Sequence, residues 1–374
     1  MHIKWLFGDN DMGNSQPTAI DLFAGAGGLS HGLIEAGFDV RVGVEIDHEA
    51  SETLRRNNKH MHVIESDLTT VDSSVIIAKG NLKGEEISLI AGGPPCKGFS
   101  TSNRKNRSLQ NPLNHLYQQF FRVIGDLSPR IFMFENVEGL CSLANGLVKK
   151  DILEISKKLG YQTNYWLIKS ENFGVPQRRK RVLFIGSKTK EFTLDENIVK
   201  HQVTVRQAID DLPSLENGNT SDMLAYRRTT GLSDYQKIMR SKNNTRDVNN
   251  NMVTKNGELA IARYKLIPQG GNWRNLPPSL MSNYKNLENC HGWIYYRLKW
   301  DKPSIVIGNF RKNMLIHPEE NRGLSVREAA RLQSFPDNYI FHGKLGSQQQ
   351  QIANAVPPLV AKAVGIQLKR ALEG

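Results

Sequence analysis

A cysteine at position 96 lies in a setting that favours chemistry over packing. It belongs to the segment Leu89-Ile-Ala-Gly-Gly-Pro-Pro-Cys-Lys-Gly-Phe-Ser100, whose first three apolar residues predict the end of a buried strand. The glycines and prolines that follow stop the strand and hold the thiol on a tight loop with little backbone freedom. A free cysteine more often packs as a small hydrophobic side chain. This loop favours the other interpretation, a thiol that acts as a nucleophile.

A carboxylate is predicted at the end of a second buried strand. Residues 129–137 form a nearly continuous apolar run that ends in Glu135 and Asn136, which is typical of a parallel strand covered on both faces. An acid at this place can simply cap the next element. If this strand and the cysteine strand are neighbours, their ends converge on one crevice and bring a nucleophile beside a carboxylic acid.

A glycine-rich turn near the start of the chain predicts a ligand site of another kind. Residues 18–30 are a strand that runs into Gly25-Ala-Gly-Gly28 and then into a helical pattern, an arrangement that lets backbone approach a nucleotide-like ligand. The next strand, residues 40–47, carries Glu45 about twenty residues beyond the glycines, as a ribose-binding acid does. The pattern does not separate a dinucleotide from S-adenosylmethionine.

The elements that must position these residues alternate along the chain. Short apolar strands alternate with helical patterns, including predicted helices near residues 115–126 and 147–159, and an arginine cluster at residues 177–181 precedes another buried strand. The alternation predicts an α/β fold with a doubly wound, mostly parallel sheet.

Charge suggests a polyanionic partner. The formal net charge is +12, and the stretch from Arg227 to Lys312 holds sixteen Lys or Arg against five Asp or Glu. Nine aromatic residues are interleaved with these charges, a mixture that serves phosphate contact and base stacking. A solvated basic face is the alternative. No apolar run is long enough to span a membrane, Met1 to Asn14 lacks the apolar core of a signal peptide, and the three cysteines are too scattered for a metal cluster.

The ordered motifs of the chain resemble those of the DNA (cytosine-5) methyltransferases. The resemblance rests on six segments in register: Asp21-Leu-Phe-Ala-Gly-Ala-Gly-Gly28, Gly93-Pro-Pro-Cys-Lys-Gly-Phe-Ser100, Phe134-Glu-Asn-Val137, Gln177-Arg-Arg-Lys-Arg181, Arg327-Glu-Ala-Ala-Arg-Leu-Gln-Ser-Phe-Pro336 and Gln351-Ile-Ala-Asn-Ala-Val-Pro-Pro358. Two departures stand beside functional positions: Lys97 where the family usually has Gln, and Ala353 where it usually has Gly.

The resemblance implies a covalent mechanism. Cys96 would add to carbon 6 of cytosine, and Glu135, with a pKa raised by burial, would donate a proton at N3. Arg179 or Arg181 would hold the base's O2 and favour the thiolate of Cys96. The sequence assigns no residue to removal of the carbon-5 proton.

The same match implies S-adenosylmethionine as cofactor, S-adenosylhomocysteine as product, and no metal. Phe23 would stack on the adenine, Gly25 and Gly27 would admit the methionine end, and Glu45 would take the ribose hydroxyls. The remaining expected cofactor residues are Ile46, Asp67, Pro95, Asn354 and Val356.

The family fold implies a discontinuous catalytic domain of the Rossmann-like class I methyltransferase type at residues 16–187 plus 311–374. A smaller target-recognition domain is expected at residues 188–310, where the family pattern is absent and Asn and Ser become more frequent. The implied partner is double-stranded DNA, with a cognate restriction endonuclease that acts separately and no membrane. The protein is expected to be a monomer in the bacterial cytoplasm, associated with the nucleoid through DNA.

Two other hypotheses fit the same motifs. One is an RNA (tRNA) cytosine-5 methyltransferase of the same family; the long basic insert favours duplex DNA. The other is a catalytically silent DNA-binding regulator on this fold. Such a regulator needs none of Cys96, Glu135 and the arginine pair, so their presence together favours an enzyme.

Overall fold

The computed structural model describes residues 16–95, 116–243, 245–284, 287, 291–308 and 310–373. Cys96 and Lys97 lie outside the described residues. The chain divides into two compact units. The sheet unit comprises the described residues of 16–173, Lys180–Lys200 and 356–373, and the second unit comprises those of Gly174–Arg179 and His201–Ala355.

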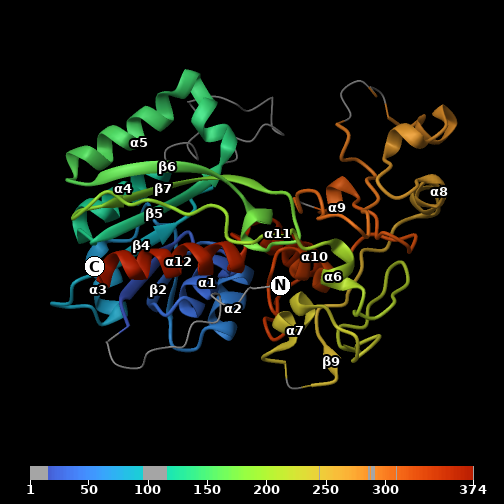
Figure 1. Ribbon diagram of the computed structural model, residues 1–374, viewed down its shortest axis with the longest axis horizontal. Coiled ribbons are helices and arrows are strands. Elements are labelled where there is room, and N and C mark those ends of the chain that lie inside the picture. Colours follow the sequence, from blue (N-terminus) through green and yellow to red (C-terminus); the bar gives the residue numbers. More distant parts are fainter. Residues whose placement is uncertain are drawn as a thin grey trace. The chain divides into compact units, whose positions relative to one another are not determined.

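One seven-stranded sheet organises the sheet unit (Figure 1). Its strands are β1 (Thr18–Leu22), β2 (Asp39–Glu45), β3 (His62–Glu65), β4 (Leu89–Gly92), β5 (Ile131–Val137), β6 (Gln162–Lys169) and β7 (Lys180–Ser187). The helices are α1 (Gly28–Glu35), α2 (His48–Asn57), α3 (Ser73–Gly80), α4 (Leu116–Leu127), α5 (Leu147–Lys158) and α12 (Pro358–Glu373), with the 3₁₀ segments η4 (Glu138–Gly146) and η5 (Ser170–Phe173).

The strand order is β3-β2-β1-β4-β5-β7-β6. Strands β1 to β5 are parallel to one another, whereas β7 runs antiparallel to both β5 and β6. The chain moves outward from β1 to β3 and then crosses back to β4 on the other side of β1, so a topological switch point lies between β1 and β4. The predicted doubly wound, mostly parallel sheet is therefore confirmed.

Apolar strands and amphipathic helices build the core of the sheet unit. Phe132 and Phe134, alternate residues of β5, point to the same face and are fully buried there against Phe120 of α4. The ring centroids of Phe120 and Phe134 are 5.3 Å apart in an edge-to-face arrangement, a favourable geometry for aromatic pairs. Ile76 of α3 and Ile152 of α5 join the same cluster. These contacts hold β5 in place against its covering helices.

Two glycines let α1 and α12 pack closely. A Cβ placed on Gly32 of α1 would lie 2.4 Å from the Cβ of Ala361 and 2.5 Å from the carbonyl oxygen of Pro358. A Cβ on Gly365 of α12 would lie 2.7 Å from the Cβ of Ala36. The C-terminal helix is thereby seated against the helix that follows the glycine-rich turn (Figure 1).

The second unit is built from short elements. Its helices are α6 (Val205–Ile209), α7 (Asp234–Arg240), α8 (Glu258–Leu266), α9 (Phe310–Asn313), α10 (Val326–Leu332) and α11 (Leu345–Asn354), with η6 (Trp273–Asn275) and η7 (Pro278–Met281). Strands β8 (Leu224–Ala225) and β9 (Asp247–Val248) form a two-stranded antiparallel sheet.

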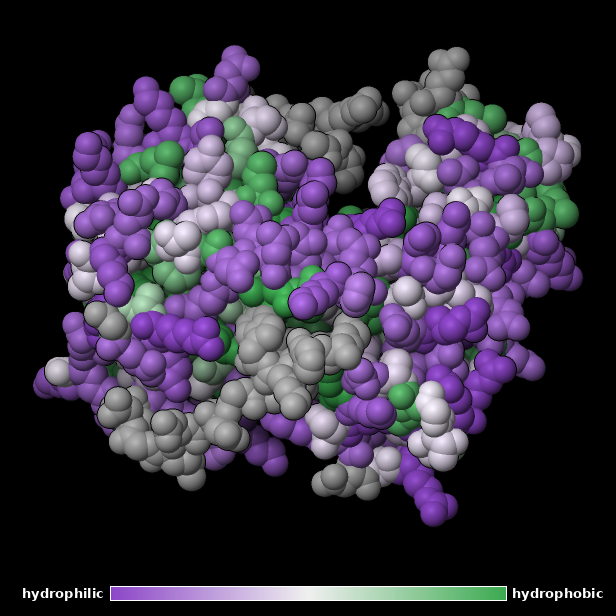
Figure 2. Space-filling model, viewed as in Figure 1, coloured by the Kyte–Doolittle hydropathy of each residue, from purple (hydrophilic) through white to green (hydrophobic). Residues whose placement is uncertain are grey.

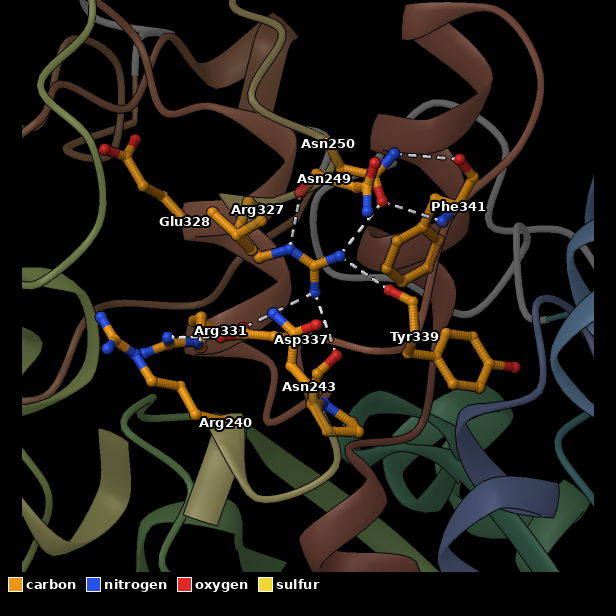
Figure 3. Close-up of polar contacts among 12 residues, drawn as sticks. Arg240, Asn243, Asn249, Asn250, Arg327, Glu328, Arg331, Asp337, Tyr339 and Phe341 are labelled. Carbon is orange, nitrogen blue, oxygen red and sulfur yellow. Dashed lines mark hydrogen bonds and ion pairs between the residues drawn. The ribbon is translucent and has the colours of Figure 1, made fainter. Parts of the chain in front are cut away.

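Buried arginines tie distant segments of this unit together (Figure 3). Arg331 pairs with Asp337 at 2.5 Å and with Asp211 at 3.2 Å, and Arg327 donates to the backbone carbonyls of Asn249 and Tyr339. All of these charged side chains are fully or almost fully buried, so each needs its partner.

These contacts bear on the expected domain boundaries. They join Arg327 and Arg331 to segments more than seventy residues earlier, and the second unit continues past residue 310 to Ala355. The packing unit thus differs from the expected recognition segment at residues 188–310, and the assignment of target recognition to that segment stays a prediction.

The visible surface is mostly hydrophilic, with hydrophobic residues in small separate groups (Figure 2). None of the described helices is long and apolar enough to cross a membrane.

We expect Gly32→Ala to destabilise the protein by roughly 1–3 kcal/mol, because the added methyl group collides with Ala361 and with rigid backbone of α12. Chemical denaturation measures the change. Gly125→Ala in α4 is the matched control, since its added Cβ meets only the flexible end of Leu159 at 3.3 Å. This substitution also removes a glycine from a helix interior, which favours the helix. Equal losses of stability in the two variants would contradict the close packing of α1 and α12.

Candidate active site

The ends of β4 and β5 bring Glu135 beside the segment that leads to Cys96. The two strands are parallel neighbours, with Gly92 opposite Phe134. A Cβ on Gly93 would lie 3.1 Å from Oε2 of Glu135, and the Asn136 side-chain amide donates to the carbonyl oxygen of Pro94 at 3.2 Å. The expectation that these strands are neighbours is confirmed. Cys96 follows Gly93 by three residues and lies outside the described residues.

Arg181 is the partner of Glu135. Its Nε lies 3.0 Å from Oε1 of Glu135, and the two side chains are only 15% and 11% exposed. The pairing follows from topology, because β7 is antiparallel to β5 and its first residues therefore lie against the last residues of β5, with Arg181 opposite Val137. A mostly buried carboxylate thus lies at ion-pair distance from a guanidinium.

Arg179 has a different environment, within the second unit. Its guanidinium donates to the carbonyl oxygens of Ala353 at 3.3 Å and Ala355 at 3.1 Å, and the residue is 2% exposed. Gln333 also donates to the carbonyl of Ala355, at 2.7 Å. Arg179 therefore braces the chain segment around Asn354. The proposed contact between Arg179 and a cytosine stays a prediction.

The glycine-rich turn forms a cradle closed by Glu45. Gly25 and Gly27 adopt φ values of +56° and +85°, which favour glycine. Oε2 of Glu45 accepts from the backbone N–H of Gly25 at 2.7 Å, and Oε1 accepts from the N–H of Asp47 at 2.8 Å. Burial raises the pKa of the Glu45 carboxyl, and these two hydrogen bonds oppose that shift. The Glu45 carboxylate is thus hydrogen-bonded to the backbone of the glycine-rich turn.

The other expected cofactor residues of the sheet unit follow the carboxyl ends of its strands. Phe23 comes directly after β1 and is a non-glycine residue with φ +60°, a strained conformation that is common at functional sites. Ile46, directly after β2, has an apolar side chain that is 64% exposed. Asp67 follows β3 and accepts from the N–H of Thr69, and Pro95 follows β4 and is exposed.

The last two expected residues fall in different units. Asn354 ends α11 in the second unit and accepts from the side-chain amide of Gln350 at 2.6 Å. Val356 begins the final segment of the sheet unit. The cofactor roles of all these residues stay predictions.

Asp21 is a charged group to which the sequence assigned no role. It is fully buried in β1 and accepts from the Ser30 hydroxyl at 2.5 Å, while its Oδ1 has no hydrogen-bond partner among the described residues. Burial raises the pKa of Asp21 to about 7. Asp21 is the first residue of the glycine-rich motif in the sequence. Its raised pKa follows from its burial in β1, which the motif alone does not show. Asp21 links β1 to α1 beneath the cradle.

We expect Asp21→Asn to stabilise the protein more at pH 8 than at pH 4. Below pH 4 the Asp21 carboxyl is protonated in both the folded and the unfolded state. Between pH 4 and pH 7 the unfolded chain loses this proton while the folded protein keeps it. The free energy of unfolding of the wild type therefore falls as the pH rises through this range. The change amounts to roughly 4 kcal/mol at most. Tm measured against pH for both proteins gives the difference.

The exposed Glu86→Gln of the same unit is the control for this measurement. A stability difference between Asp21→Asn and wild type that is flat from pH 4 to pH 8 would contradict the effect of burial.

The comparisons with known proteins bear on the family of the chain. The sequence model of the C-5 cytosine-specific DNA methylases matches residues 18–370. The chain is 35% identical to the type II methyltransferase M1.HphI of Haemophilus parahaemolyticus over 93% of this chain and 85% of that protein. It is 34% identical to the type II methyltransferase M.DdeI of Desulfomicrobium norvegicum over 92% and 86%, respectively.

Solved structures are similar over almost the whole chain. A crystal structure described as a prophage-encoded DNA modification methyltransferase from E. coli has a TM-score of 0.75 and 27% identity, and the match covers 96% of this chain and all of that one. The match extends over both compact units. The fold, the order of motifs and the relatives agree, and the chain belongs to the C-5 cytosine-specific DNA methylase family.

Proposed function

We propose that this DNA cytosine-5 methyltransferase acts through a covalent adduct between Cys96 and a cytosine flipped out of duplex DNA, with Glu135 as the acid. One observation carries the proposal: the Glu135 carboxylate lies against Gly93, three residues before Cys96, with Arg181 paired to it. Extrusion of the base from the duplex is required because the reacting atoms are otherwise shielded by stacking.

The cradle suits S-adenosylmethionine as the methyl donor. Gly25 and Gly27 keep their turn free of side chains, Glu45 presents a carboxylate for ribose hydroxyls, and Ile46 offers an exposed apolar surface for a base. The bound cofactor supplies an electrophilic methyl group on a sulfonium. Phe23, Asp67, Pro95, Asn354 and Val356 complete the proposed cofactor set.

The residues of the chain make the cytosine reactive. The thiolate of Cys96 forms a bond to carbon 6, and Glu135 gives a proton to N3, so that carbon 5 becomes nucleophilic and takes the methyl group. A base then removes the carbon-5 proton, the carbon 5–carbon 6 double bond returns, and Cys96 leaves as the thiolate. The residue that serves as this base is not assigned.

The two arginines divide the supporting roles. Arg181 keeps its Nε on Glu135 and binds the cytosine O2 with the rest of the guanidinium, which stabilises the charge that develops on the ring. Arg179 positions the segment around Asn354 through the carbonyls of Ala353 and Ala355.

The partners follow from the type of relative. DNA is the substrate, and we propose that it is double-stranded and read by residues 188–310, within which the basic stretch begins. Relatives named type II methyltransferases favour a separate restriction endonuclease with the same target sequence. We further propose that the protein is a cytoplasmic monomer that works on chromosomal DNA.

Glu135→Gln should lower kcat by about 10²–10⁴-fold, because the amide can keep the contact with Arg181 but cannot give up a proton. S-adenosylmethionine affinity should stay unchanged. Glu138→Gln is the matched control, since Glu138 is three residues away with an exposed side chain 3.9 Å from Lys180. Methyl incorporation into DNA measures both, and full activity in Glu135→Gln would remove the acid from the mechanism.

A duplex with 5-fluorocytosine at the target should become covalently linked to the protein when S-adenosylmethionine is present, because fluorine cannot leave as a cation. The target is first located by methylation-sensitive sequencing of DNA from cells that express the protein. A denaturing gel should show a shifted band for wild type and for Cys141→Ser, and none for Cys96→Ser. Trapping that survives Cys96→Ser would assign the nucleophile elsewhere.

A further inference from the structure

A hollow in the second unit is surrounded by positive charge. Its volume is about 160 Å³. Its lining includes Arg178, Lys299, Lys302 and Tyr296, with the buried Leu298 and Ile305 below. We call the first four residues and the space between them the cation pocket.

Backbone pairing holds Arg178 beside the lysine segment. Gln177 and Ser304 form a parallel bridge, in which the N–H of Arg178 donates to the carbonyl of Ser304 at 2.9 Å. The N–H of Ser304 donates in turn to the carbonyl of Pro176, also at 2.9 Å. The carbonyl of Lys302 accepts from the N–H of Val205, the first residue of α6. The backbones that carry two of the three cations are therefore fixed before any ligand binds.

The Lys299 side chain lies against a glycine. A Cβ placed on Gly270 would lie 2.0 Å from Cε of Lys299, so the lysine stem crosses directly over this glycine. Gly270 has φ +80° and donates its N–H to the carbonyl of Arg297 at 2.8 Å. The lysine stem therefore packs on the backbone of this glycine.

The three cations have no acid partner among the described residues. Arg331 and Arg322 are buried and paired with carboxylates, whereas Arg178, Lys299 and Lys302 are exposed and make no ion pair with a described carboxylate. Asp301, an exposed acid between the two lysines, is not among the residues that line the hollow.

Tyr296 adds a neutral donor to the pocket. Burial raises the pKa of its phenol, against the opposing charge of Arg178, so the hydroxyl keeps its proton at neutral pH. Its ring centroid is 6.3 Å from that of Trp293, whose side chain is 46% exposed. Three cations without an acid partner among the described residues, together with one hydroxyl donor, suit a negatively charged phosphodiester better than an uncharged nucleobase edge.

We propose that the cation pocket binds one backbone phosphate of the DNA strand that carries the target cytosine, close to that nucleotide. The proposal rests on the proposed function. Arg178 precedes Arg181 by three residues, so their Cα atoms are at most about 11 Å apart along the chain. A phosphate held at Arg178 is therefore within a few nucleotides of a cytosine held at Arg181.

The test uses the full-length protein and a duplex with the located target site. The variants are Arg178→Gln, Lys299→Gln, Lys302→Gln and the triple combination. Because all three cations hold one phosphate, the triple variant should lower the slope of log affinity against log salt by about one, and not by three. DNA affinity at moderate salt should fall at least tenfold, while Tm and S-adenosylmethionine affinity stay at wild-type values.

Two controls address charge alone. The triple variant Lys79→Gln, Lys157→Gln, Lys158→Gln makes the same charge change at exposed positions of α3 and α5, and it should leave the slope unchanged. The variant Lys299→Arg, Lys302→Arg keeps the charge and should keep most of the affinity. An equal loss of slope in the α3 and α5 control would overturn the assignment to this pocket.

A scan of the duplex with single methylphosphonate linkages identifies the phosphate. One neutral linkage should weaken wild type about as much as the triple substitution does, and should not weaken the triple variant further. A slope that falls by about three, a slope that does not fall, or additive losses at every linkage would each overturn the proposal. Methyl transfer by wild type to the same unmodified duplex is measured in parallel, and its absence would overturn the proposed function instead.

Discussion

The candidate site depends on the parallel alignment of β1 to β5, which puts five carboxyl ends on one edge of the sheet. Phe23, Glu45, Asp67 and Pro95 each stand at or just after such an end, and Glu135 lies one residue beyond the last pairing of β5 with β4. Strand β7, next to β5, runs in the opposite direction. Only a strand of opposite direction can begin beside the end of β5. That reversal delivers Arg181 to Glu135.

Charged residues that stabilise the fold differ in burial and pairing from those that are available to a ligand. In the second unit, Arg331 and Arg322 are removed from water and each meets a carboxylate, which offsets a desolvation cost of several kcal/mol per ion. Asp21 is buried without a cation partner among the described residues, and its raised pKa expresses that cost. The cations around Tyr296 are left exposed and without acids among the described residues. Charge that the fold does not neutralise is the charge available to a polyanion.

Sequence patterns predicted the parts of the structure that depend on local order. The apolar run before Glu135 and the glycine and proline stop after Leu89 each imply a strand end, and parallel pairing then brings the two ends together. The extent of the second unit was not predictable in this way, because Arg331 meets Asp211 across 120 positions of the chain. Periodicity contains no information about such a pair. The perturbed acid Asp21 was equally hidden, since burial is a property of the assembled sheet.

The arginine-rich motif shows why residue type alone could not assign roles. Around its bridge to Ser304 the segment is extended, so successive side chains alternate in direction. Gln177 and Arg179 are buried, and Gln177 accepts from the N–H of Ile307 while Arg179 braces Ala353 and Ala355. Arg178 and Lys180 are exposed on the alternate positions. Arg181 opens the strand that pairs with β5. Three arginines of identical chemistry therefore brace a backbone, face the cation pocket and pair with a carboxylate. The phase of the extended segment separates Arg178 from the other two, and the pairing of β7 with β5 separates Arg181 from Arg179.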